Sequence, residues 1–110
     1  MKQYDKIILT KMLDEIKVLE KSVGKLTEKE FLLDEDKKRA TGMTLINIGE
    51  LANHLSKEFI GATKEIPFRK IVDLRNVAAH GYFTIVFEDI WRLVQQDIPQ
   101  LKIKLKEMLS

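Results

Sequence analysis

Apolar residues recur at intervals of three and four along almost the whole chain, and this period restricts its fold more than any other feature. Such spacing places apolar side chains on one face of a helix, so each stretch that carries it is expected to form an amphipathic α-helix. Residues 101–106 alternate as a strand would, but the sequence offers no partner strand, and helix is expected there too. The pattern predicts an all-α protein, folded as an antiparallel helical bundle.

The boundaries of the first helices follow from capping signals. The first helix is expected over about residues 4–25. Residues 27–30 have the sequence of a capping box, which predicts a short helix that carries residues 31–33 into the core. Acidic side chains at residues 34–36 would stabilise the positive, N-terminal end of a helix dipole. A long helix is therefore expected from there to about residue 56.

The long helix has an apolar face and two glycines. Gly42 and Gly49 each weaken a helix by about 1 kcal/mol relative to alanine, so close packing against another helix is expected to be their purpose. Its inward positions are expected to be Ala40, Met43, Leu45 or Ile46, Leu51 and Leu55.

Residues 59–66 break the helical period and predict a loop. Pro67 suits the first position of the next helix, which is expected to run to about His80. Gly81 would then cap its C-terminus, because glycine enters the left-handed region without penalty.

The last helix is expected from about Ile85 to the end of the sequence. Pro99 lacks a backbone N–H and clashes with the preceding turn, so a kink or break is expected near Asp97. The prediction is therefore four main helices and one short helix in a single domain that spans residues 1–110.

The chain has a small net charge of +2, from 19 Lys and Arg against 17 Asp and Glu. The net charge is therefore too small to attract the whole molecule to nucleic acid, and any RNA binding must depend on a local group of basic side chains. Basic runs such as Lys37–Arg39 are expected to be solvated helix faces. No apolar run is long enough for a signal peptide or a membrane span, so a cytoplasmic protein without a membrane partner is expected.

Metal and cofactor chemistry has little support in the sequence. The chain has no cysteine and only two histidines, so neither a metal site nor a bound cofactor is predicted. His54 lies near Glu50, and a surface hydrogen bond is the favoured interpretation for it. Trp91 is the sole tryptophan and is expected in the core or at a dimer interface rather than as a surface for base stacking.

The segment from Arg75 to His80 holds the residues best suited to catalysis. RNA supplies its own nucleophile, the 2′-hydroxyl, so a protein that cleaves RNA needs only a proton acceptor, a proton donor and a cation for the developing oxyanion. Histidine and arginine together cover these roles. The structural alternative is that Arg75 pairs with a carboxylate such as Asp73, while His80 simply ends a helix.

Helix geometry alone does not bring Arg75 and His80 together. Five residues of ideal helix leave the two side chains roughly 140° apart, whereas Asn76 and His80 share a face. The two groups could meet on one phosphate if the helix ends at His80, or if a second copy of the chain supplies the missing partners across a two-fold axis.

Several blocks of sequence closely resemble the HepT toxins of the HEPN superfamily. They are Arg75-Asn76, His80-Gly81-Tyr82, Ile48-Gly49-Glu50-Leu51-Ala52, Ile90-Trp91 and Asp97-Ile98-Pro99-Gln100-Leu101. The resemblance covers nearly the whole chain and departs from the family at Phe68, where a tryptophan is common. It implies a HEPN-like homodimer that cleaves RNA without metal. Arg75 and His80 would be catalytic at the dimer interface, with Asn76 in a supporting polar role.

The resemblance also implies a regulatory partner. Proteins of this kind are typically encoded beside a minimal, MntA-like nucleotidyltransferase antitoxin, which attaches AMP to a tyrosine that matches Tyr82. An anionic phosphate two residues from His80 would occupy the cation meant for RNA. Without the resemblance, Tyr82 would be interpreted as an aromatic residue packed at a helix end beside Phe83. Two rival interpretations stay open: a catalytically silent module that binds RNA or the nucleotidyltransferase, and a plain helical interaction protein.

Overall fold

The structure, a computed structural model, describes residues 1–79 and 85–110, with only the backbone of residues 74–79. These residues contain no strand, which confirms the all-α prediction. Six helices follow one another in them: α1 (Gln3–Val23), α2 (Glu28–Leu33), α3 (Glu35–Asn53), α4 (Lys57–Ala62), α5 (Phe68–Ala79) and α6 (Phe87–Leu109).

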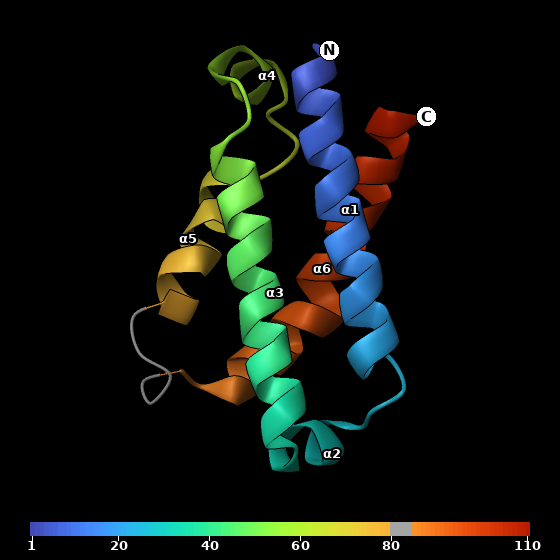
Figure 1. Cartoon of the computed structure of the whole chain (residues 1–110), viewed down its shortest axis with the longest axis vertical. Helices are drawn as coiled ribbons and strands as arrows, with labels where there is room; N and C mark the ends of the chain where they lie inside the picture. The colour runs from blue at the N-terminus through green and yellow to red at the C-terminus, as the bar shows by residue number, and fades with distance from the viewer. Residues whose placement is uncertain (80–84) are drawn as a thin grey trace.

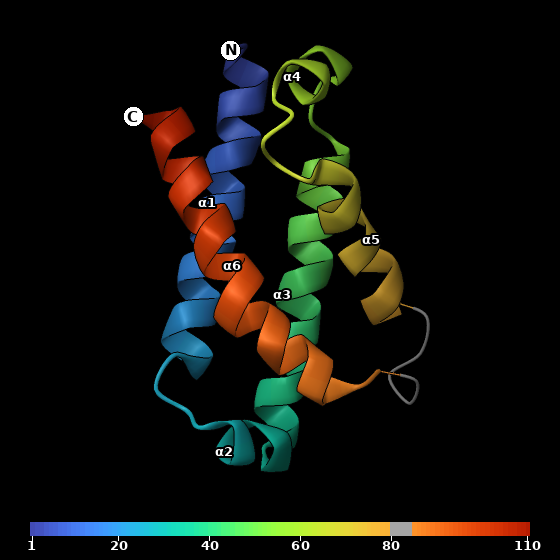
Figure 2. The ribbon, with the colours of Figure 1, turned by 180° about the vertical axis from the view of Figure 1, so that it is seen from behind.

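Four of these helices, α1, α3, α5 and α6, run alternately in opposite directions (Figure 1). In this view α5, α3 and α1 stand side by side, and Figure 2, the view from the opposite side, shows α6 in front, crossing α3 and α1. Both chain termini and α4 lie at one end of the bundle, and α2 lies at the other. The apolar faces of the helices meet between them, with fully buried side chains that include Leu9, Met12, Ile16, Phe31, Leu45, Ile48 and Leu105.

The capping box at the start of α2 is confirmed. The Thr27 hydroxyl accepts the N–H of Glu30 at 3.2 Å, and the Glu30 carboxylate accepts the N–H of Thr27 at 2.9 Å. Phe31 is fully buried, with its ring centroid 5.2 Å from that of Trp91. The prediction that Leu33 enters the core is wrong, because this side chain is 76% exposed. Two residues of helix turn it about 200° away from Phe31.

The register predicted for α3 is partly wrong. Ala40 and Met43 are exposed, while Thr41, Thr44 and Ile48 are buried instead. The Thr44 hydroxyl donates to the carbonyl of Ala40 at 3.0 Å, so its polar atom is satisfied inside the helix and the rest of the side chain packs inward. A pattern of apolar residues alone does not reveal such inward-facing threonines.

The expected role of Gly42 in close packing is also wrong. A Cβ atom added at this glycine would meet no atom of the described residues within 4 Å. Gly49, by contrast, is buried on the inward face of α3. Gly42 therefore weakens α3 without giving a packing benefit in the described part of the molecule.

Helix α4 replaces the first part of the expected loop at residues 59–66. The long helix α3 ends at Asn53, earlier than predicted, and Ser56 then caps α4 by accepting the N–H of Phe59 at 3.2 Å. A serine followed by helix-forming residues is a recognised start signal. In the sequence, the interrupted spacing of apolar residues favoured a loop over a helix capped by Ser56.

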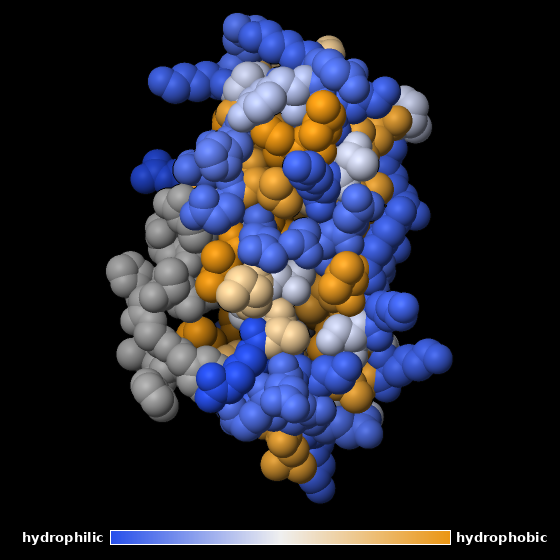
Figure 3. Space-filling view, viewed as in Figure 1, coloured by the Kyte–Doolittle hydropathy of each residue, from blue (hydrophilic) through white to orange (hydrophobic). Residues whose placement is uncertain are grey.

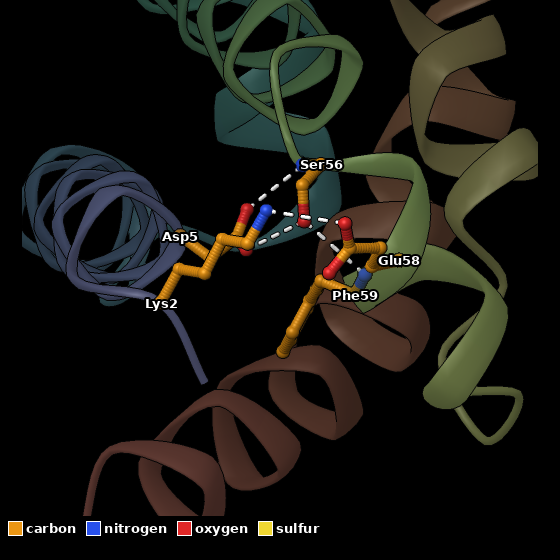
Figure 4. Close-up of polar contacts among 5 residues, drawn as sticks. All are labelled: Lys2, Asp5, Ser56, Glu58 and Phe59. Carbon is orange, nitrogen blue, oxygen red and sulfur yellow. Dashed lines mark hydrogen bonds and ion pairs between the residues drawn. The ribbon is translucent and has the colours of Figure 1, made fainter.

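Asp5 holds this cap in place (Figure 4). Its side chain is buried, and its two oxygens accept the N–H of Ser56 at 2.8 Å and the Ser56 hydroxyl at 2.6 Å. Beside it, Lys2 forms an ion pair with Glu58 at 3.2 Å. These contacts fasten the start of α1 to α4, and hence to the segment that leads into α5.

Helix α6 continues through Pro99, so of the kink or break expected near Asp97 the break is wrong. Proline cannot donate to the carbonyl of Gln95, but the helix is held in place by the burial of Ile98, Leu101 and other apolar residues on either side. Lys102 also ties α6 to α1, with its ammonium group 2.8 Å from the nearer carboxylate oxygen of Glu20. None of the described helices combines the length and apolar character needed to cross a bilayer.

Candidate functional site

Helix α5 carries the beginning of the candidate catalytic segment and packs along α3 (Figures 1 and 2). Pro67 lies one residue before α5 rather than at the predicted first position, and its carbonyl accepts the N–H of Ile71 at 3.1 Å. Phe68 and Ile71 are buried and anchor the first turns of α5 in the core. At position 68, where the resembling family often has tryptophan, phenylalanine fills a core site and contacts Phe59, with ring centroids 5.8 Å apart.

The structure places Arg75 and Asn76 on α5, within the five residues that end this helix at Ala79. Arg75 follows Phe68 by seven residues, about two helical turns, so the two Cα atoms lie on the same side of α5. The side chains of Arg75 and Asn76 lie outside the described residues, as do His80, the expected cap Gly81, and Tyr82. The meeting of guanidinium and imidazole groups stays a prediction.

The block Ile48–Ala52 lies on α3, the helix against which α5 packs. Ile48, Gly49 and Ala52 are buried, so packing in the core explains the identity of these three residues of the block. Glu50 is half-buried on the remaining side. One turn earlier, the amide of Asn47 donates to the carboxylate of Glu15 on α1 at 2.7 Å, a cross-helix contact that the sequence did not predict.

His54 follows the last residue of α3 and is exposed. In the part of the chain that the structure describes, no group of three histidine, cysteine or acidic side chains could hold a metal ion.

A cavity of about 210 Å³ lies between the first turns of α5 and the middle of α6. Ile71, Leu93, Ile98 and Leu101 give it an apolar lining. Lys70, Asp97 and Lys104 also line it, and Lys104 donates to the backbone carbonyl of Glu65. Among the described residues, the cavity thus combines an apolar lining with charges of both signs.

The downstream motif blocks have a structural role in α6. Ile90, Ile98 and Leu101 are buried, and Trp91 is half-buried against Phe31. Of the two places expected for Trp91, the core and a dimer interface, the structure shows it packed against the core. The tryptophan therefore helps to join α6 to α2.

Comparison with known proteins places these features in a family. A family model described as "Ribonuclease HepT-like" matches residues 12–108. "Probable ribonuclease HepT" of Thermococcus cleftensis is 29% identical over 108 residues, which cover 98% of each chain. "Putative RNase TTE0752" of Caldanaerobacter subterraneus subsp. tengcongensis is 31% identical over 102 residues, which cover 93% of this chain and 91% of that one. No solved structure matches the chain.

Proposed function

Because this chain belongs to the Ribonuclease HepT-like family, we propose that it is a metal-independent endoribonuclease of a toxin-antitoxin system. The observation that carries the proposal is the family match over residues 12–108, supported by relatives named as ribonucleases that align over nearly their whole length. The matched residues include Arg75 and His80, the two side chains proposed to carry RNA cleavage. The proposed reaction is attack of the 2′-hydroxyl on the adjacent phosphate.

His80 would move the protons in this reaction. It directly follows the last residue of α5, and the negative end of a helix favours the protonated form of an imidazole. One histidine would accept the proton of the 2′-hydroxyl, and a second would donate a proton to the leaving 5′-oxygen. Arg75 would stabilise the charge that develops on the phosphate oxygens, and Asn76 would position the phosphate by hydrogen bonding.

The second histidine would come from a second copy of the chain. Each chain has only one histidine in the candidate segment, and the helical spacing of Arg75 and His80 does not bring them onto one phosphate. A two-fold symmetric homodimer would supply two copies of each group to one cleft. The active species would therefore be the dimer.

Regulation is proposed to act on Tyr82. A minimal nucleotidyltransferase partner would transfer AMP from ATP to the Tyr82 hydroxyl, releasing pyrophosphate. The new phosphate would carry negative charge two residues from His80 and would compete with RNA for the Arg75 cation. Modification would thereby silence the nuclease.

Incubating single-stranded RNA with purified protein in excess chelator tests the catalytic proposal. Arg75→Ala and His80→Ala are each expected to lower the cleavage rate by at least about 100-fold, the usual range for loss of a charge-stabilising or acid–base group. Arg69→Ala on the same helix and His54→Ala, the other histidine, are matched controls that should keep full activity. Both control residues are exposed.

Other outcomes would identify the rival functions. Binding of RNA without cleavage by the wild-type protein would mean a silent RNA-binding module. Absence of any RNA effect, together with stable self-association, would mean a helical interaction protein. Equal activity of the His80→Ala and wild-type proteins would contradict the proposed chemistry.

The regulatory proposal is tested by co-expression with a candidate nucleotidyltransferase, followed by mass spectrometry. We expect added AMP mass on the peptide that contains Tyr82, and its loss in Tyr82→Phe. Tyr4→Phe removes the only other tyrosine and should leave the modification unchanged. Modification mapped to another residue would contradict this part of the proposal.

A further inference from the structure

The cavity between α5 and α6 lies where these two helices separate. Helix α5 packs mainly on α3, whereas α6 packs on α1 and α2, and Figure 2 shows α5 and α6 spreading apart towards the end of the bundle that holds α4. The volume of about 210 Å³ exceeds the roughly 150 Å³ at which an aliphatic cavity engineered into another protein binds benzene. An apolar group somewhat larger than a benzene ring therefore fits.

The inner lining of this cavity is aliphatic. Ile71, Ile98 and Leu101 are buried, and Leu93 is half-buried beside them. No aromatic side chain of the described residues lines the cavity, so a nucleobase would find no ring to stack on, and these four side chains offer no hydrogen bonds to its edges. The lining thus suits an apolar body without polar groups.

The charged side chains lie at different ends of the cavity. Lys104 donates to the carbonyl of Glu65, two residues before Pro67, so its ammonium group lies beside the start of α5. Lys70 follows Pro67 by three residues, about one helical turn, which places it near the same end. Asp97 precedes Lys104 by two turns of α6, about 10 Å along the axis. An anion between the two lysines would therefore lie away from this carboxylate.

Both ammonium groups can accept an anion. Lys70 is exposed, and no acidic side chain that the structure describes forms an ion pair with it. Lys104 is half-buried and uses one of its three N–H donors on the Glu65 carbonyl, so two donors remain. The carbonyl also holds this ammonium group in place, which lowers the entropy cost of binding a ligand.

A second hollow, between α1 and α3, suits an anion less well. It lies on the face shown in Figure 3, where apolar side chains are interspersed with polar and charged ones, and its volume is about 440 Å³. The carboxylates of Asp14, Glu15 and Glu50 line it beside a single lysine, Lys11. Three carboxylates would repel an anion, so the cavity between α5 and α6 is the better site for one.

We propose that the cavity between α5 and α6 binds a small monocarboxylate with an aliphatic body. Its body would lie against Ile71, Leu93 and Leu101, and its carboxylate would accept hydrogen bonds from Lys70 and Lys104. Such a ligand would join the two helices that precede and follow residues 80–86 in the sequence. The inference adds a ligand site to the molecule and does not depend on RNA cleavage.

Isothermal titration calorimetry with octanoate tests this site on the whole chain. We expect one site with a dissociation constant below about 1 mM. Acetate, which lacks the aliphatic body, and octylammonium, which reverses the charge, should each bind at least about tenfold more weakly. Contacts should appear as nuclear Overhauser effects between octanoate and the methyl groups of Ile71, Leu93 and Leu101.

Substitution of lysine by methionine keeps the aliphatic stem and removes the charge. Lys70→Met and Lys104→Met should each raise the octanoate dissociation constant at least about tenfold, without lowering the helical content measured by circular dichroism. Lys106→Met, on the exposed side of α6, and Lys11→Met, in the second hollow, are matched controls that should bind as the wild type does.

Three results would overturn the inference. The first is no binding of octanoate at about 10 mM. The second is an unchanged dissociation constant in both Lys70→Met and Lys104→Met. The third is tighter binding of AMP than of octanoate in the same cavity, which would mean a nucleotide site instead.

Discussion

Asp5 shows how a single polar residue organises one end of the bundle. It lies on the inward face of α1, in register with Leu9, Met12 and Ile16, and it is 1% exposed. Its position on the apolar stripe was visible in the sequence, but its partner, Ser56, lies 51 residues away. A long-range pair of this kind has no local signal, which is why the capping of α4 was not predicted.

Replacing Asp5 by alanine would leave the N–H and hydroxyl of Ser56 without their acceptor. Hydrogen bonds to a charged group contribute about 1.5 to 3 kcal/mol each, so we expect Asp5→Ala to lower the free energy of unfolding by about 2 kcal/mol or more. Urea unfolding followed by the fluorescence of Trp91, the sole tryptophan, measures this change. Asp97→Ala, at an exposed aspartate of α6, is the control and should stay within about 0.5 kcal/mol of wild type. An equal effect of both changes would contradict the assigned role of Asp5.

Candidate catalytic residues could be chosen from the sequence, because a histidine and an arginine close together suit one kind of chemistry and the motif blocks resemble one family. Their arrangement could not be derived. The angle between Arg75 and His80 depends on how the helix ends, and in the proposed function the cleft also needs groups from a second copy of the chain. Neither property is encoded in the local spacing of the residues.

At the scale of the helices, sequence patterns predicted where most helices lie better than which side of each helix is buried. The capping box of α2 and the proline before α5 act within one turn, so both were predicted correctly. The register of α3 was missed because Thr41 and Thr44 pack inward, the latter with its hydroxyl bonded to the preceding turn. Pro99 was expected to kink or break α6, and the helix does not break because burial of the neighbouring apolar residues outweighs the lost hydrogen bond.

The two glycines in and after the long helices should respond oppositely to alanine. At Gly42, inside α3, a Cβ atom would meet no described atom within 4 Å, so Gly42→Ala should raise the free energy of unfolding by about 1 kcal/mol. At Gly24, which caps α1, the Cβ atom would clash with the carbonyl of Glu20. Gly24→Ala should lower the free energy of unfolding by about 1 kcal/mol or more. Urea unfolding of both variants measures the pair, and a destabilised Gly42→Ala would mean that α3 packs closely there.

At the scale of the whole molecule, the proposed function makes activity a property of the dimer. If both copies contribute groups to one cleft, the specific activity should fall as the protein is diluted below its dimer dissociation constant. Cleavage rates measured over a dilution series, together with the dimer fraction from sedimentation equilibrium, test whether specific activity follows the amount of dimer. A specific activity that stays constant through dissociation would show that one chain suffices.

The ends of the cleaved RNA test the central claim most directly. A short single-stranded RNA and its 2′-deoxy counterpart are incubated with the wild-type protein in excess chelator, and the products are analysed by mass spectrometry. Attack by the 2′-hydroxyl predicts 2′,3′-cyclic phosphate and 5′-hydroxyl ends from the RNA, with the deoxy strand left intact. Products with 3′-hydroxyl and 5′-phosphate ends, or cleavage of the deoxy strand, would contradict it.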